Sequence, residues 1–150
     1  MLTWTTYGRW LQGDGRGYSR DGRVLGRDPG VRRANRDALK GDAVCLSTEE
    51  RQIVEEAINS EARSLGQKIY AAAVCPRHVH LVLECNSETM ETTAARYKRA
   101  ATAALTSSGF EGKIWTRGYD KRFCFDEKTL RNRIEYVLRH NGEGGAGLRC

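Results

Sequence analysis

Three histidines and one tyrosine stand at spacings that could assemble a metal centre. His78 and His80 lie two positions apart in "CPRHVHLVLEC", a run typical of a β-strand, and His140 follows Tyr136 by four positions in "IEYVLRHN". Side chains alternate along a strand, so His78 and His80 share one face. Residues four apart on a helix also share a face, so Tyr136 and His140 project together. The sequence therefore predicts one divalent ion held by the three histidines beside a tyrosine hydroxyl.

Such a centre is suited to phosphoryl transfer. A divalent ion can polarise a phosphoryl oxygen and neutralise charge during an in-line displacement. A tyrosine beside it can attack phosphorus and hold the product as a covalent phosphotyrosine. Because a phenol has an ordinary pKa of about 10, a neighbouring cation has to assist it at neutral pH.

Simpler interpretations of the same residues stay open. A His-x-His pair also arises from ordinary polar alternation on an exposed strand, and Tyr136 could be a half-buried packing residue. The chain has only three histidines, and all of them fall in these two places, which favours a shared site. Three imidazoles would by ligand softness favour Zn²⁺, Ni²⁺ or Mn²⁺ over Mg²⁺.

The elements that must position these residues follow a recognisable order. Apolar periodicity predicts strands at 2–8, 68–75 and 78–85, and a strand or extended arm at 112–126. Capping residues predict a helix at 46–66, which begins with a Ser47–Glu50 capping box. Two further helices are predicted, one from Ser87 or Thr89 to Gly109 and one from Asp126 to Gly142. This series predicts an α+β, ferredoxin-like antiparallel sheet with helices on one face, plus an additional C-terminal helix that carries Tyr136.

The whole chain, 1–150, is predicted to be a single domain. Residues 12–46 form a long basic loop rich in Gly and Arg, in which "VRRANRDAL" could make a short helical turn, and 142–150 form a flexible tail. A loop this long inside a compact domain is generally functional or mobile.

Composition limits the class of partner and compartment. Lys and Arg number 25 against 19 Asp and Glu, which gives a net charge of +6 and favours a polyanionic partner. No apolar run is long enough to span a membrane, and the opening "MLTWTTYGRW" lacks the pattern of a secretory signal. Five cysteines without a CxxC pair then indicate reduced thiols in a cytoplasmic protein.

Three stretches resemble the single-tyrosine HUH transposases, in particular their insertion-sequence and REP-associated members. "HVHLVL" resembles the His-hydrophobe-His signature of HUH endonucleases, and "LTWTTYGRWLQGDGRG" resembles the opening strand and loop of these transposases. "IWTRGYDKRFCFDEKTLRNRIEYVLRHN" resembles their C-terminal half, where a Trp-x-Arg-Gly-Tyr stretch precedes the helix with the nucleophilic tyrosine. The three motifs occur in the family's order, and the resemblance covers most of the chain.

This resemblance implies a ferredoxin-like enzyme that nicks and rejoins single-stranded DNA at hairpin-flanked sites. It implies that Tyr136 is the nucleophile, which forms a 5′-phosphotyrosine and leaves a free 3′-hydroxyl. It implies His78 and His80 as paired metal ligands, His140 as the third, and Mg²⁺ or Mn²⁺ as the ion, with other divalent ions also possible. Tyr119 is a weaker candidate nucleophile, because it lies in an extended region rather than on the helix with His140.

Basic and aromatic residues beyond the centre are candidates for DNA contacts. Arginines in the long loop would recognise a hairpin, and those on the second helix and before the last helix would follow a DNA backbone, although any one of them could simply be solvated. The set comprises Arg16, Arg32, Arg33, Arg96, Lys98, Arg99, Arg117, Tyr119, Lys121 and Arg122.

Other functions compete with the nicking enzyme. A hairpin-binding protein that does not cut would have no need of three histidines and Tyr136 together. Replication initiators and relaxases share the HUH motif but usually have longer chains, and a structural zinc protein would be expected to place cysteines near the histidines. The resemblance allows either a homodimer that exchanges tyrosine helices, as in insertion-sequence relatives, or a monomer, as in REP-associated ones.

Overall fold

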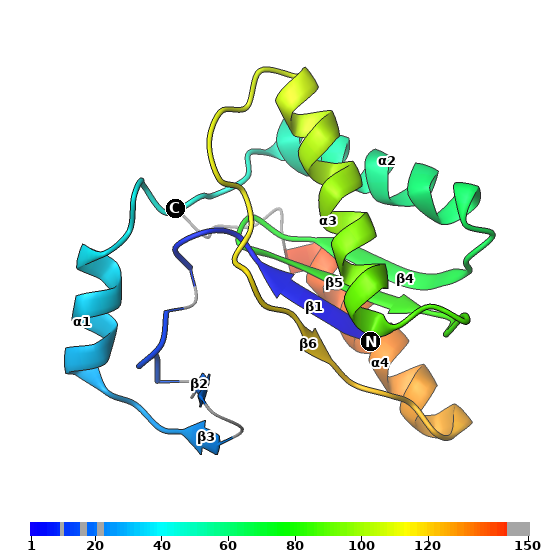
Figure 1. The fold of residues 1–150 in the computed structure, drawn as a ribbon. Coiled ribbons are helices and arrows are strands. Elements are labelled where there is room, and N and C mark those ends of the chain that lie inside the picture. The colour runs from blue at the N-terminus through cyan, green and yellow to red at the C-terminus, as the bar shows by residue number, and fades with distance from the viewer. Residues whose placement is uncertain (10, 16–17, 21–22, 144–150) are drawn as a thin grey trace.

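The computed structural model describes residues 1–143 except 10, 16–17 and 21–22. Its main sheet has four antiparallel strands in the order β4-β5-β1-β6 (Figure 1). These strands are β1 (Leu2–Thr5), β4 (Ile69–Val74), β5 (His78–Leu83) and β6 (Asp120–Lys121). The first predicted strand is therefore shorter than expected, and the predicted extended arm at 112–126 contributes only β6 and an isolated bridge between Thr6 and Trp115.

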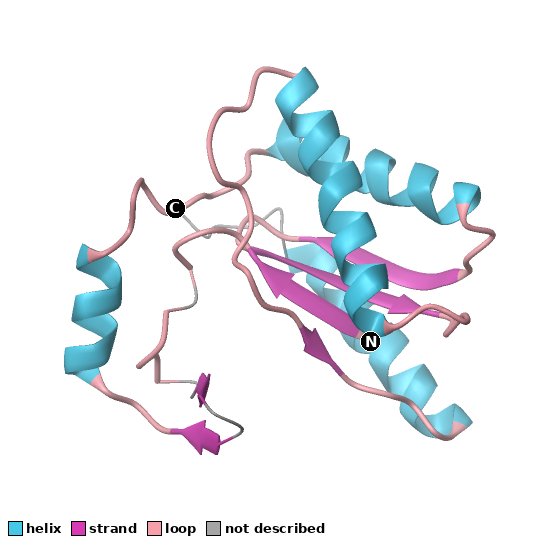
Figure 2. Ribbon diagram, in the orientation of Figure 1, coloured by secondary structure: helices cyan, strands magenta, loops and turns pink. Residues whose placement is uncertain are grey.

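Helices cover both faces of this sheet. The helices α2 (Thr48–Ser64) and α3 (Met90–Ser107) lie on one face, and α4 (Glu127–Glu143) crosses the other (Figure 2). A β-α-β-β-α-β series with an antiparallel sheet is compatible with the predicted ferredoxin-like plan, and α4 follows that series in the chain. The coarse fold class, α+β with an antiparallel sheet, is confirmed.

Side-chain alternation on β5 divides the interior into two cores. Val79, Leu81 and Leu83 belong to the core under α2 and α3, whereas Val82 belongs to the core under α4. His78 and His80 are each an even number of positions from Val82 along the strand, so their side chains point to the same face as Val82, the α4 side. The apolar pattern that fixes this strand's register thereby also fixes the face on which the imidazoles lie.

Local signals place the helix ends close to their predicted positions. The backbone N–H of Glu50 donates to Ser47 Oγ at 3.1 Å, and the N–H of Ser47 donates to Glu50 Oε2 at 2.7 Å, which is the predicted capping box. Gly66 follows α2 with φ +60, a left-handed conformation that glycine adopts without a steric cost. Before α4, Asp126 accepts a hydrogen bond of 2.7 Å from the N–H of Thr129.

The long basic segment at 12–46 contains regular structure that its composition hides. Strands β2 (Tyr18–Arg20) and β3 (Arg23–Leu25) form a hairpin, and α1 (Pro29–Asp37) follows, with Asp28 accepting a hydrogen bond of 3.0 Å from the N–H of Val31. Figure 2 shows α1 and the hairpin beside the sheet rather than on one of its faces. The predicted helical turn in this segment is thus a helix of nine residues.

The cysteines agree only partly with the prediction of reduced thiols. Cys75, Cys85 and Cys124 are not in disulfide bonds, and Cys75 is buried in the core under α4. Cys45 is disulfide-bonded, so the prediction is wrong at that position. Pairing depends on how close two thiols come in the fold, which cysteine count and spacing do not determine. Among the described residues, no helix has the length and apolarity needed to cross a membrane.

Candidate metal centre

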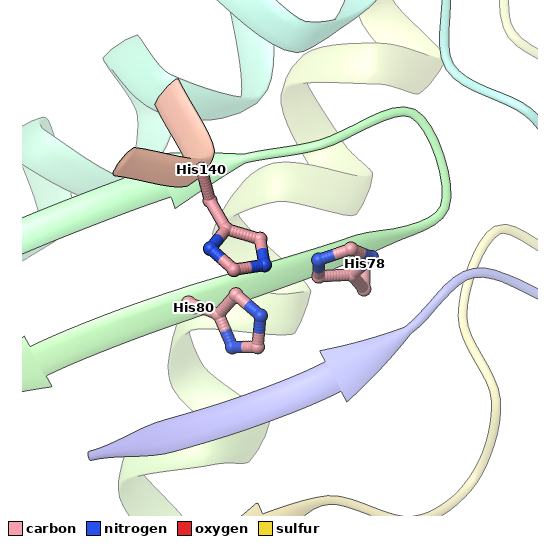
Figure 3. Close-up of side chains that lie close together, drawn as sticks. All are labelled: His78, His80 and His140. Carbon is pink, nitrogen blue, oxygen red and sulfur yellow. The ribbon is translucent and has the colours of Figure 1, made fainter. Parts of the chain in front are cut away.

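The three histidines meet at one place between β5 and α4. One ligand atom of each of His78, His80 and His140 lies within 4.8 Å of the others. The ring centroids of His78 and His80 are 4.6 Å apart, and those of His80 and His140 are 5.2 Å apart. Figure 3 shows one ring nitrogen of each histidine turned toward a common point. The strand pair and the helix residue that the sequence singled out therefore form one cluster.

An apolar stripe on α4 carries Tyr136 and His140 to this cluster. Leu130, Ile134 and Val137 face the sheet and pack with the core under α4, and Val137 is fully buried. These positions follow the spacing of one helix face. Packing that face against β4 and β5 brings the neighbouring positions 136 and 140 to the end of β5 where His78 and His80 stand.

Hydrogen bonds orient two of the three imidazoles. Nδ1 of His80 lies 2.8 Å from Oγ1 of Thr3, and Nδ1 of His140 lies 2.9 Å from the backbone oxygen of Tyr136. A carbonyl oxygen only accepts, so Nδ1 of His140 donates and its Nε2 is unprotonated in the neutral ring. If Thr3 accepts in the same way, Nε2 of His80 is also the free ligand atom.

The sequence alone did not indicate that Thr3 contacts His80. Thr3 is the Cα partner of His80 in the antiparallel pairing of β1 with β5, and directly opposed residues share a face of the sheet. The register of β1 is set by interactions distant in sequence, so alternation within β1 alone does not identify Thr3 as the partner of His80. The signal that could have found it is the pairing of the two strands.

The protonation state of His80 suits metal binding. His80 is only 7% exposed, and its burial, followed by the charges of His78, His140 and Arg122, lowers its pKa to about 3. His80 is therefore a neutral imidazole at pH 7, the form that binds a metal. Three converging imidazole nitrogens fit a divalent transition ion, and such a donor set leaves coordination positions for a substrate.

Tyr136 lies at the edge of the cluster. Its ring centroid is 4.4 Å from that of His140 and 5.6 Å from that of His80, and the side chain is 44% exposed. A tyrosine that only packed the core would be buried, as Tyr97 is. Tyr136 is instead partly exposed beside the imidazoles of His80 and His140.

The centre opens into a cleft of about 1140 Å³. Its lining includes all three histidines and Tyr136, together with four arginines from three other segments: Arg9, Arg77, Arg32 and Arg36. Asp14 and Asp42 also line it. We call this space the cleft.

Of the loop residues predicted to contact DNA, Arg32 reaches the cleft. Arg33 is exposed on α1 but does not line the cleft, because consecutive helix residues point in different directions. Arg16 lies outside the described residues. Arg9 and Arg77 were not among the predicted contacts, since only the folded paths of two loops bring them to the centre.

The predicted contacts on α3 lie on the other side of the sheet from α4 and are partly engaged elsewhere. Arg96 forms ion pairs with Glu88 at 3.1 Å and Glu61 at 3.6 Å. Lys98 donates to the backbone oxygens of Thr116 at 2.9 Å and Gly118 at 2.7 Å, and burial lowers its pKa to about 8. Lys98 thus holds the segment before β6, and Arg99 is exposed on the same helix.

The predicted contacts around β6 are dispersed. Arg117 and Lys121 are exposed, and Arg122 is ion-paired with Asp120 at 3.0 Å. Tyr119 packs against the core under α2 and α3, away from the imidazoles, which distinguishes it from Tyr136 as a candidate nucleophile.

No model of a known protein family matches this chain, and no curated protein matches it in sequence.

Proposed function

We propose that this protein is a metal-dependent enzyme that nicks and rejoins single-stranded DNA through Tyr136, as a member of the single-tyrosine HUH transposases. The observation that carries the proposal is the convergence of an accessible tyrosine with three imidazoles from a strand and a helix. A structural zinc site would not require a phenol at its open side.

In the proposed reaction Tyr136 is the nucleophile. Its phenol loses a proton to solvent, its oxygen bonds to the phosphorus of a phosphodiester, and the bond from phosphorus to the 3′ oxygen breaks. The departing oxygen takes up a proton and becomes a free 3′-hydroxyl, while the 5′ phosphate stays on the tyrosine. Rejoining reverses these steps with a 3′-hydroxyl as the attacking group.

His78, His80 and His140 would hold the divalent ion. When bound, Mg²⁺, Mn²⁺ or another divalent ion would supply positive charge to the phosphoryl oxygens. The chain's own contribution is to keep His80 neutral by burial, to fix two rings through their Nδ1 atoms, and to hold the tyrosine beside them.

Hairpin-flanked DNA as the target is taken from the resemblance of the three sequence motifs. An antiparallel α+β sheet in the order β4-β5-β1-β6 is compatible with the fold that this family implies. The cleft with four arginines beside the centre supports a polyanionic substrate.

The proposal is tested by forming the covalent product. Labelled single-stranded hairpin DNA from the flanks of the gene is incubated with the protein and Mn²⁺, or with a chelator, and separated under denaturing conditions. We expect an adduct that requires metal, is lost in Tyr136→Phe and persists in Tyr119→Phe. Hairpin binding without an adduct under any divalent metal would instead indicate a hairpin-binding protein that does not cut.

A further inference from the structure

Helix α1 is held beside the centre although it contributes nothing to either core. Within the part of the chain that the structure describes, none of its nine residues is buried. A helix this short is not stable in water by itself, so other contacts must hold it. The backbone N–H of Asp28 donates to the oxygen of Gly13 at 3.1 Å, and the backbone N–H of Lys40 donates to the hydroxyl of Tyr7 at 3.0 Å.

The segment after α1 is also packed tightly against the end of β1. A Cβ on Gly8, which has φ +75, would lie 2.8 Å from Cα and Cβ of Ala43. The N–H of Val44 donates to the oxygen of Tyr7 at 2.9 Å. These contacts hold α1 beside the sheet rather than against it, and the cleft lies between the two.

The face of α1 toward that space is basic. Arg32 and Arg36, one helical turn apart, both line the cleft. Like charges at this spacing destabilise a helix. A helix whose inner face is positively charged and unburied is suited to cover an anion rather than an apolar surface.

The side of the cleft opposite α1 is also lined by arginines. Arg9 and Arg77 line it, and burial together with the charge of Arg77 lowers the pKa of Arg9. The Nε–H of Arg9 donates to the oxygen of Val44 at 3.0 Å, which fixes one edge of the guanidinium group. Four guanidinium groups therefore face two carboxylates, those of Asp14 and Asp42, in a space that ends at the imidazoles.

We propose that the cleft holds the phosphodiester backbone of a single DNA strand between α1 and the sheet. Arg32 and Arg36 would contact phosphates from one side, and Arg9 and Arg77 from the other. The cleft, at about 1140 Å³, exceeds the roughly 300–1,000 Å³ typical of small-molecule pockets, so it has room for more than one nucleotide. The class of ligand rests on the proposed function, whereas the path of the strand follows from the arginines.

The test measures binding without catalysis. Anisotropy of a labelled oligo-dT, which forms no hairpin, is recorded with the full chain in chelator at several salt concentrations. Neutralising phosphates on a single strand gives a salt slope of about −0.7 per contact, so four contacts predict a slope of about −2.8 and an affinity loss of about 50-fold between about 50 and about 200 mM salt. For Arg32→Gln with Arg36→Gln, we expect a slope of about −1.4 and a loss of about sevenfold.

The matched control is Arg63→Gln with Lys68→Gln, which removes the same charge from two exposed residues near the end of α2 and before β4, neither of which lines the cleft. This pair should keep nearly the slope of the unmodified protein. Equal slopes for the two double variants, or no binding of oligo-dT, would overturn the inference. Arg77→Gln alone should lower the slope by about 0.7, which tests the opposite side if the α1 variant fails to fold.

Failure of this inference is distinguishable from failure of the proposed function. Cleft-dependent binding of oligo-dT without any adduct on hairpin DNA would refute nicking and support the strand path. A metal-dependent adduct whose yield and salt dependence are the same in both double variants would support nicking and refute the strand path.

Discussion

Replacing Thr3 with valine removes the hydroxyl that contacts Nδ1 of His80 and keeps the shape of the side chain. The contact is 2.8 Å long and joins two residues that are directly opposed in the β1–β5 pairing. If His80 binds an ion through Nε2, its Nδ1 carries a proton, and Nδ1–H donates a hydrogen bond to Oγ1 of Thr3. Without that acceptor, the ring can rotate and can populate the tautomer that does not bind metal.

The expected loss of metal affinity can be estimated from the surroundings of Thr3. Removing such a partner of a metal-binding histidine typically costs 10- to 100-fold in metal affinity. Thr3 is only partly buried and lines the cleft, so water can replace its hydroxyl. We therefore expect the lower end, about 10-fold, which corresponds to about 1.4 kcal/mol.

The assay is calorimetric titration of the metal-free protein with Mn²⁺ and, separately, Zn²⁺. Thr3→Ser retains a hydroxyl and should restore most of the affinity. The control is Thr5→Val on the same strand and face, because the hydroxyl of Thr5 contacts Thr116 rather than a histidine. Unchanged affinity in Thr3→Val, or an equal loss in Thr5→Val, would refute the role of Thr3 as the residue that orients His80.

Two further predictions concern the metal-free protein. Because the pKa of His80 is lowered from 6.5 to about 3, the unfolded state binds the extra proton between these values, and stability should fall as pH drops from 6.5 toward 3. Denaturant midpoints in chelator should show a weaker decline over this range in His80→Gln, and an identical decline would contradict the assignment. Gly8→Ala should lower stability by about 1–3 kcal/mol, since it places a Cβ 2.8 Å from Ala43 at φ +75. Gly66→Ala, at φ +60 with no atom within 4 Å, should cost about 1 kcal/mol, and thermal melts that rank the two variants the other way would contradict the account of the packing.

Local sequence signals were sufficient for most of the scaffold. The Ser47–Glu50 capping box and the left-handed Gly66 bound α2 as predicted, because both depend on residues near in sequence. The alternation of His78, Val79 and His80 predicted which face of the strand carries the imidazoles. These predictions hold because side-chain alternation and helix capping depend on residues only a few positions apart in the sequence.

Contacts between segments that are distant in sequence could not be predicted from such local patterns. The position of Thr3 opposite His80 needs the register of two strands that are far apart in sequence. Arg9 and Arg77 reach the cleft because the loop after β1 and the turn before β5 meet, with the N–H of Thr6 donating to the oxygen of Arg77 at 2.9 Å. The helical segment α1 has no apolar stripe to bury, so its composition indicated a loop.

The most direct test of the central claim is to identify the residue that becomes attached to DNA. After reaction of hairpin DNA with the protein and Mn²⁺, nuclease and trypsin treatment would reduce the adduct to a peptide bearing a nucleotide, for mass spectrometry. Tyr136 lies in the tryptic peptide 134–139, "IEYVLR", which contains no other hydroxyl group. The account predicts the nucleotide mass on this peptide, linked through phosphate to Tyr136. A nucleotide on any other peptide would contradict it.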